Sequence, residues 1–213
     1  MASNKKKYLT TLLISTILSV GILFVRNLVE NNSNYNFLLW NLFLGFIPFG
    51  VVLLIDIFYQ KLNTILIVLG VCLWLLFYPN APYMISDLIH VDKNSSVVLY
   101  DTLIIFSLSI LSLFYGFYSL KLVYEILVKW KSKKIANFLI SFCIVLSSFG
   151  IYLGRILRLN SWDVFTKPIQ TAITIFEHLF PVTKNPVTYL VIFLFSFVQF
   201  MVWFLIKDFK YVE

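Results

Sequence analysis

Long runs of apolar residues dominate the chain and determine its predicted elements. Six runs are long enough to cross a membrane as helices of about 20 residues. They cover residues 8–25, 37–58, 62–78, 101–120, 135–154 and 187–206. The sequence lacks the strict alternation of a membrane β-barrel. Since lipid cannot satisfy backbone hydrogen bonds, helices are predicted. We expect an all-α integral membrane bundle of about six transmembrane helices, forming a single domain over residues 1–213.

One further pattern is apolar on a single face. Residues 164–180 carry apolar side chains at helical spacing, namely Phe165, Ile169, Ala172, Ile173, Phe176 and Phe180. The opposite face is polar and includes Lys167, Glu177 and His178. This pattern is typical of an amphipathic helix that lies on a membrane surface. A seventh span is the alternative, but it would bury Glu177.

Composition excludes a soluble protein and gives the predicted orientation. Of the 213 residues, 60% are apolar and 13% are charged, whereas soluble domains have about 25% charged residues. With a cytoplasmic N-terminus, the predicted inner segments contain 11 of the 17 Lys and Arg residues. This bias follows the positive-inside rule. Both termini are therefore predicted to be cytoplasmic, with the amphipathic helix extracytoplasmic. The net charge of +7 then requires no nucleic-acid partner, and the lipid bilayer is the expected partner.

The first apolar run follows three lysines, as the apolar core of a secretory signal peptide would. It leads into Arg26-Asn-Leu-Val-Glu30 without a small-x-small cleavage site. An uncleaved first span is therefore the favoured interpretation.

Polar residues gather in three segments at the predicted outer ends of spans three, four and five. These segments are residues 78–90, Tyr100-Asp101 and residues 150–163. Ionisable groups at such depth are costly and suggest function. We expect the three segments to reach one level of the membrane. The candidate catalytic residues are Asp87, His90 and Asp101, and the candidate binding residues are Asn80, Arg155, Arg158, Asn160 and Asp163.

Arg155 and Arg158 are three residues apart and would share a helix face. Two outer arginines oppose the positive-inside tendency, so we expect them to face inward and to be held by Asp87, Asp101 or Asp163. In that position they would bind an anionic group such as phosphate. The alternative is that both side chains extend to lipid phosphates.

The other polar residues also have structural interpretations. Asp101 is a candidate N-cap of the fourth helix, and Asn160 or Ser161 of the outer helix. His90 is either a general base oriented by Asp87 or a surface histidine. Asp87-x-x-His90 is a weak metal-ligand pair without an HExxH or HxxxH element, so no metal is predicted and no cofactor is identified.

Two smaller features concern packing. Gly150 and Gly154 form a small-x-x-x-small pair, which predicts close approach of another helix. Asn41 is expected to face the interior of the bundle.

Several of these segments carry strings that are typical of one family. They are Trp40-Asn-Leu-Phe-Leu-Gly-Phe-Ile-Pro48, Trp74-Leu-Leu-Phe-Tyr-Pro-Asn-Ala-Pro-Tyr83, Ser86-Asp-Leu-Ile-His90, Tyr100-Asp101 and Gly154-Arg-Ile-Leu-Arg-Leu-Asn-Ser-Trp-Asp163. Over residues 37–206 the chain resembles a bacterial membrane family known as domain of unknown function 1361. The resemblance implies a multi-pass protein of the bacterial plasma membrane. It implies no catalytic role for any residue.

The functional hypothesis is that a polar site at the outer face binds or processes an anionic lipid or cell-envelope precursor. On this hypothesis, replacing Arg155 by leucine should abolish function and leave membrane abundance intact. The alternatives are a transporter or channel subunit and a non-catalytic accessory subunit of a membrane complex. The sequence does not decide whether the protein is an enzyme, and it identifies no protein partner.

Overall fold

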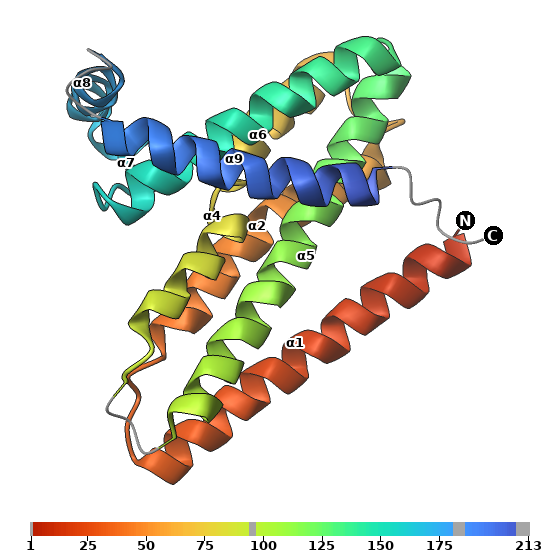
Figure 1. The fold of residues 1–213 in the computed structure, drawn as a ribbon. Coiled ribbons are helices and arrows are strands. Elements are labelled where there is room, and N and C mark those ends of the chain that lie inside the picture. The colour runs from red at the N-terminus through yellow and green to blue at the C-terminus, as the bar shows by residue number, and fades with distance from the viewer. Residues whose placement is uncertain (1, 94–96, 181–185, 208–213) are drawn as a thin grey trace.

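The computed structural model describes residues 2–93, 97–180 and 186–207, with side chains from Lys6 onward. Lys184 and Lys210, which enter the predicted orientation, lie outside these residues. Every regular element in the described residues is helical (Figure 1). The elements are α1 (Ala2–Glu30), α2 (Phe37–Phe58), α3 (Thr64–Phe77), α4 (Asn80–Tyr83), the 3₁₀ helix η1 (Met84–His90), α5 (Val98–Trp130), α6 (Lys133–Arg155), α7 (Asp163–Thr166), α8 (Pro168–Leu179) and α9 (Pro186–Ile206).

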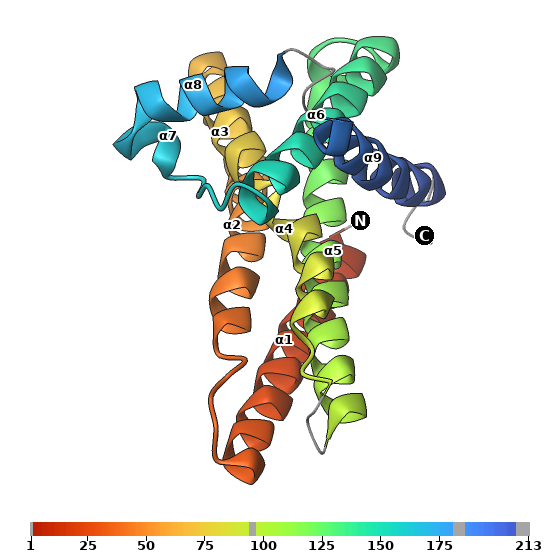
Figure 2. The same cartoon turned by 60° about the vertical axis from the view of Figure 1, so that its left-hand side comes forward.

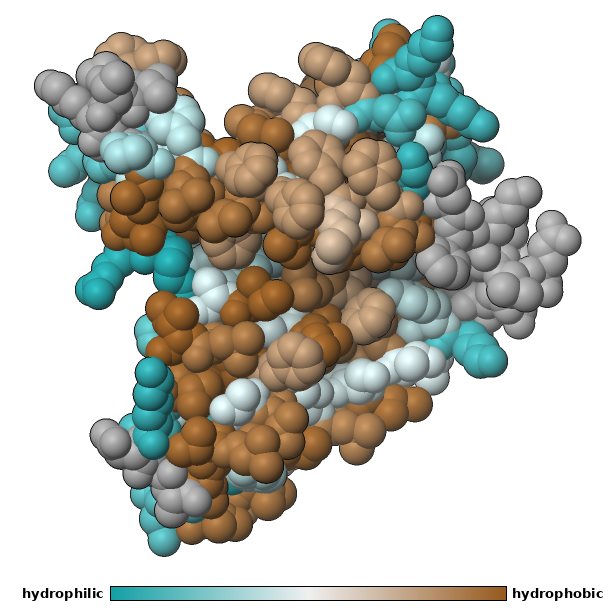
Figure 3. All heavy atoms as spheres, viewed as in Figure 1, coloured by the Kyte–Doolittle hydropathy of each residue, from teal (hydrophilic) through white to brown (hydrophobic). Residues whose placement is uncertain are grey.

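The predicted all-α membrane bundle is confirmed. In the described part of the chain, six segments are long and apolar enough to cross a membrane: Lys6–Glu30, Phe37–Phe58, Thr64–His90, Val98–Trp130, Lys133–Arg155 and Pro186–Ile206. Figure 3 shows hydrophobic residues across the middle of the visible face, with hydrophilic residues toward its ends. Such a surface suits a lipid environment rather than water. Which end faces the cytoplasm stays a prediction.

Helix α5 is the central element of the bundle. It packs against α1, α2, α4, η1 and α6, and 67% of its most apolar window is buried. Figures 1 and 2 show α1 beside one half of α5, and α6 and α9 side by side. Serines join α5 to the segment before it, because Ser109 Oγ donates to the Met84 carbonyl at 2.7 Å and Ser112 Oγ to the Ala81 carbonyl at 3.1 Å. These are interhelical packing contacts of the kind found between membrane helices.

The third span was predicted over residues 62–78, and α3 ends next to that boundary, at Phe77. The chain bends at Pro79 and continues through α4 and η1, so that the apolar helical segment extends from Thr64 to His90. Pro79 is the N-cap of α4 and Pro82 lies in its first turn. The first turn of a helix has no intrahelical partner for its N–H groups, so proline is tolerated there. Asn80 therefore lies within the helical segment rather than at its end.

The predicted outer helix over residues 164–180 is two helices, α7 and α8. Lys167 separates them with φ −139° and ψ 55°, because the residue before a proline is disfavoured in the α region. Helix α8 keeps the predicted amphipathic character, since Ile169, Ile173 and Phe176 are exposed while Thr171 is buried. Figures 1 and 2 show α8 next to α7 and away from α1.

Candidate functional site

Arg155 connects the end of α6 to the segment formed by α4 and η1. Its Nε donates to Ser86 Oγ at 2.8 Å, its Nη2 to Asp87 Oδ1 at 2.5 Å, and its Nη1 to His90 Nε2 at 3.0 Å. The guanidinium carbon also lies 4.0 Å from the centre of the Tyr83 ring. All four partners lie within eight consecutive residues, 83–90. One side chain therefore fixes the end of α6 against a single short segment.

Asp87 is the aspartate that holds Arg155. It is fully buried, and its second oxygen accepts a hydrogen bond from Asn41 Nδ2 at 2.8 Å. Asn41 thus faces the interior, as predicted. A buried carboxylate is tolerated only when it is paired and its lone pairs are used, and Asp87 meets both conditions.

Arg158 does not share a helix face with Arg155, so this part of the prediction is wrong. Helix α6 ends at Arg155, and Arg158 has a left-handed backbone with φ 57°. The Leu159 amide then donates to the Leu153 carbonyl at 3.0 Å, which closes the end of the helix. The Arg158 side chain is exposed. Within the described residues it makes no ion pair.

Asp101 belongs to a second ion pair and not to the cluster around Arg155. Its carboxylate accepts hydrogen bonds from Arg26 Nε at 2.9 Å and from Arg26 Nη2 at 3.3 Å, and both side chains are buried. Arg26 Nη1 also donates to Asn32, and its guanidinium carbon lies 4.6 Å from the centre of the Tyr35 ring. Asp101 lies inside the first turn of α5 and is not its N-cap.

Asn80 and Asp101, which were expected at one level, lie at different positions along α5. Ala81, next to Asn80, contacts Ser112 of α5. From residue 101 to residue 112, at about 1.5 Å per residue, α5 rises about 16 Å. The reason is the continued helix after Pro79, which takes residues 80–90 back along α5 instead of ending at the surface.

Aromatic residues connect the two ion pairs. Tyr35 contacts Arg26, and its ring centre lies 6.4 Å from that of Phe37. The Phe37 ring lies edge-on to His90 at 5.3 Å. Burial raises the pKa of Tyr35, so its phenol stays neutral, and its oxygen accepts a hydrogen bond from the Asp92 amide at 3.2 Å. The two pairs are thus separate but joined by packed rings.

A pocket of about 470 Å³ opens beside Arg155. Its lining comes from α2, α3, α4, η1, α6, α7, α8 and the loop 156–162. Five of the eight predicted site residues line it: Asn80, His90, Arg155, Arg158 and Asn160. The three aspartates, Asp87, Asp101 and Asp163, are not in the lining. Apolar walls complete it, with Trp40, Leu44, Leu76, Ile89, Leu153, Trp162 and Ile175. We call this space the polar pocket.

Hydrogen bonds position the loop that carries Arg158. Asn80 Nδ2 donates to Ser161 Oγ at 3.1 Å, and Ser161 Oγ donates to the Leu76 carbonyl at 3.2 Å. Asp163 Oδ2 accepts from the Asn160 amide at 2.7 Å. The Asp163 carbonyl also accepts from Thr171 Oγ1 at 3.2 Å, which joins α8 to α7. Asp163 and Ser161 therefore shape the pocket by holding its loop.

Gly150 allows α6 to approach α4 closely, as its small-x-x-x-small pair with Gly154 predicted. A Cβ atom at Gly150 would lie 2.7 Å from Pro79 Cγ. Because the proline ring is rigid, we expect Gly150→Ala to destabilise the fold by about 1–3 kcal/mol. Gly21→Ala is the control, since a Cβ there meets nothing within 4 Å. Thermal unfolding of the purified variants in detergent measures the difference, and equal stability would contradict the close approach.

Metal ligands do not gather in the described residues. No group of three or more His, Cys, Asp or Glu side chains there is arranged to hold a metal ion. Asp87 and His90, the weak candidate ligands, are both used by Arg155. The pocket is therefore basic and amide-rich in its chemistry.

Sequence reasoning missed Arg26, Tyr83, Ser86 and the two tryptophans of the pocket. Trp40 and Trp162 lie 122 positions apart in sequence, yet their rings are 6.2 Å apart. Arg26 carried a usable signal, because it is an arginine directly after an apolar run at the predicted outer end. Nothing in the sequence indicated which aspartate it would meet.

The fold and the site define a multi-pass helical membrane protein with an Arg–Asp pair, its aspartate buried, beside a basic, partly apolar pocket. A family model described as "Protein of unknown function (DUF1361)" matches residues 40–202. The chain belongs to this family. No curated protein and no solved structure matches the chain.

Proposed function

We propose that the polar pocket binds the anionic head group of an amphiphile, either a lipid or a cell-envelope precursor, in the bacterial plasma membrane. The observation that carries the proposal is that Arg155 and Arg158 line the same hollow as a set of apolar side chains. Guanidinium groups bind phosphate and carboxylate oxygens through paired hydrogen bonds. The apolar wall suits the adjoining hydrocarbon of the ligand.

The two arginines have different roles in this proposal. Arg158 is exposed and its guanidinium serves as the main anchor. Arg155 uses three of its five N–H groups on Ser86, Asp87 and His90. Two N–H groups remain for a ligand. Asn80 and Asn160 add amide groups to the lining, and Trp40 and Trp162 supply flat apolar surfaces.

Binding is better supported than chemical processing. Both oxygens of Asp87 are occupied and the residue is fully buried, so it acts as a positioning residue for Arg155. A guanidinium can only donate, so Nε2 of His90 accepts and is not available as a base until that hydrogen bond breaks. Asp101 has no part in the pocket, because Arg26 holds it elsewhere.

The test is binding of a short-chain anionic lipid to Arg158→Gln. With dihexanoyl phosphatidic acid as the probe, we expect this variant to lose about 10- to 100-fold in affinity, since a hydrogen bond to a charged group contributes about 1.5–3 kcal/mol. Isothermal titration calorimetry of the purified protein measures the change. Lys167→Gln removes the same charge from an exposed residue outside the lining. Unchanged binding by Arg158→Gln, or equal weakening by Lys167→Gln, would refute the proposal.

A further inference from the structure

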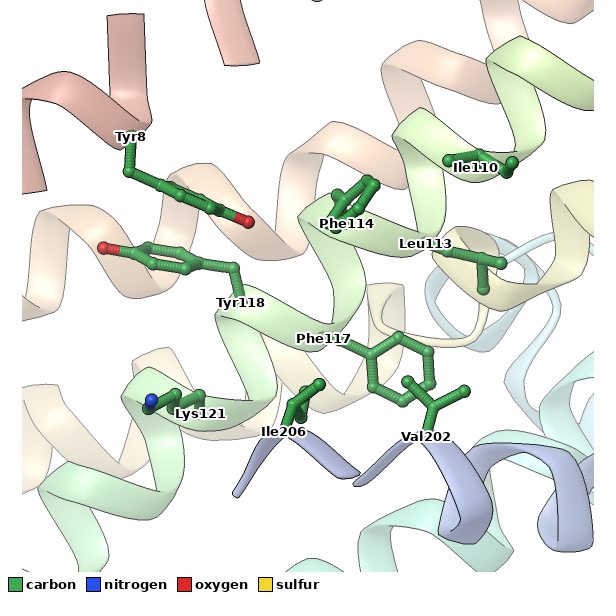
Figure 4. A pocket seen from close by; sticks show the side chains of 9 residues that line it. All are labelled: Tyr8, Ile110, Leu113, Phe114, Phe117, Tyr118, Lys121, Val202 and Ile206. Carbon is green, nitrogen blue, oxygen red and sulfur yellow. The ribbon is translucent and has the colours of Figure 1, made fainter. Parts of the chain in front are cut away.

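A second hollow lies between α1, α5 and α9, and it shares no lining residue with the polar pocket. Its volume is about 470 Å³. Figure 4 shows its walls, with Tyr8 from α1, residues between Ile110 and Lys121 from α5, and Val202 and Ile206 from α9. We call it the apolar groove.

The groove has one polar end. Tyr8 and Tyr118 stack there with ring centres 4.6 Å apart, and Lys121 lies one turn further along α5 (Figure 4). Lys6 and Lys7 directly precede Tyr8, and Lys207 directly follows Ile206. Lys121 lines this end, and Lys6, Lys7 and Lys207 lie within two residues of lining residues in sequence; we call these four the rim lysines. The remaining wall is aliphatic and aromatic.

The length of the groove matches the hydrocarbon thickness of one leaflet of a bilayer. From residue 110 to residue 121, at about 1.5 Å per residue, α5 rises about 16 Å. The hydrocarbon core of a bilayer is about 30 Å thick, so one leaflet accounts for about half of this. A groove that begins at lysines and ends about one leaflet deeper has the dimensions of a single phospholipid chain below its head group.

We propose that the apolar groove holds an acyl chain of an anionic phospholipid from the leaflet on the lysine-rich side. The rim lysines bind the phosphate of its head group, since basic side chains at this depth attract anionic lipid. A transmembrane helix of a partner or of a second copy is a poorer fit. Such a helix is about 10–12 Å across and must cross the whole core of about 30 Å, whereas the groove is half as long.

Filling the groove with a large side chain tests whether an acyl chain occupies it. Leu113→Trp and Val202→Trp each place an indole in it from a different helix, and Leu103→Trp is the control at an exposed position of α5. The proteins are equilibrated with an equal mixture of phosphatidylglycerol and phosphatidylcholine, and retained lipid is counted by native mass spectrometry. We expect one phosphatidylglycerol on the wild type and on the control, and at least tenfold lower occupancy in both filled variants. If one filled variant does not fold, the other decides.

Removing the rim charge tests the head group. The fourfold Lys→Gln variant of the rim lysines is expected to lose the preference for phosphatidylglycerol over phosphatidylcholine. Its control is the fourfold Lys→Gln variant at Lys129, Lys131, Lys133 and Lys134, which removes the same charge near the turn between α5 and α6. Retained lipid in both filled variants, an equal loss of preference in both fourfold variants, or a wild-type dimer that filling converts to monomer would each overturn the proposal.

Discussion

Replacing Arg155 by leucine is expected to destabilise the protein by about 3–5 kcal/mol, because it leaves a buried carboxylate without its cation. Among the described residues, Asp87 would keep the hydrogen bond from Asn41. The same substitution removes the contacts of α6 with Ser86, His90 and Tyr83. The temperature of thermal unfolding in detergent and the abundance of the protein in the membrane should both fall.

The double variant Arg155→Leu/Asp87→Asn separates the charge from the contacts. Neutralising residue 87 removes the unpaired charge and keeps an oxygen for Asn41, so most of the lost stability should return. Arg155→Lys is the complementary control, since it keeps a positive charge but lacks the planar group that reaches three partners. Full stability of Arg155→Leu, or no recovery in the double variant, would contradict a stabilising role for the pair.

This expectation revises the sequence-based hypothesis about Arg155. From the sequence alone, its loss should remove function and spare abundance. In the structure Arg155 holds the site together, so its loss affects abundance as well. Arg158 is the sharper probe of ligand binding, because it is exposed and lies outside the ion pairs of the described residues.

The spans were predictable because each depends on local sequence. The predicted bounds of the second span are those of α2, since a polar loop precedes it and Gln60-Lys61 follows it. The helical continuation after Pro79 was not predicted, because a proline ends a helix or starts the next one depending on what packs around it. Here Pro79 packs under Gly150 of α6, and this contact is not local in sequence.

The site was predictable as a set of residues but not as a set of pairs. Five predicted residues line one pocket because the segments 78–90 and 150–163 meet. Asp101 was grouped with them by its position at the start of a span. Its true partner, Arg26, is 75 residues away. Which acid meets which base depends on lateral helix packing, and a single sequence does not record it.

The Arg26–Asp101 pair gives the second large effect, because α1 is held mainly by its packing on α5. Only 11% of the most apolar window of α1 is buried, and α5 is its main packing partner. The pair joins the two helices near one end by two parallel hydrogen bonds, an arrangement that is among the strongest for an ion pair. The contact with Tyr35 extends it to the loop between α1 and α2.

We therefore expect Arg26→Leu to cost about 3–5 kcal/mol, since it leaves Asp101 buried and unpaired. Because only 11% of the most apolar window of α1 is buried, the loss should appear first as its local release from α5 rather than as global unfolding. Chymotrypsin should then cleave faster after Tyr35, which is buried in the intact protein. The double variant Arg26→Leu/Asp101→Asn should recover stability. The control is Arg158→Gln, which removes the same charge from an exposed residue, and chymotrypsin should cleave it at the wild-type rate. Equal cleavage of Arg26→Leu and the wild type would mean that α1 stays on α5 without the ion pair.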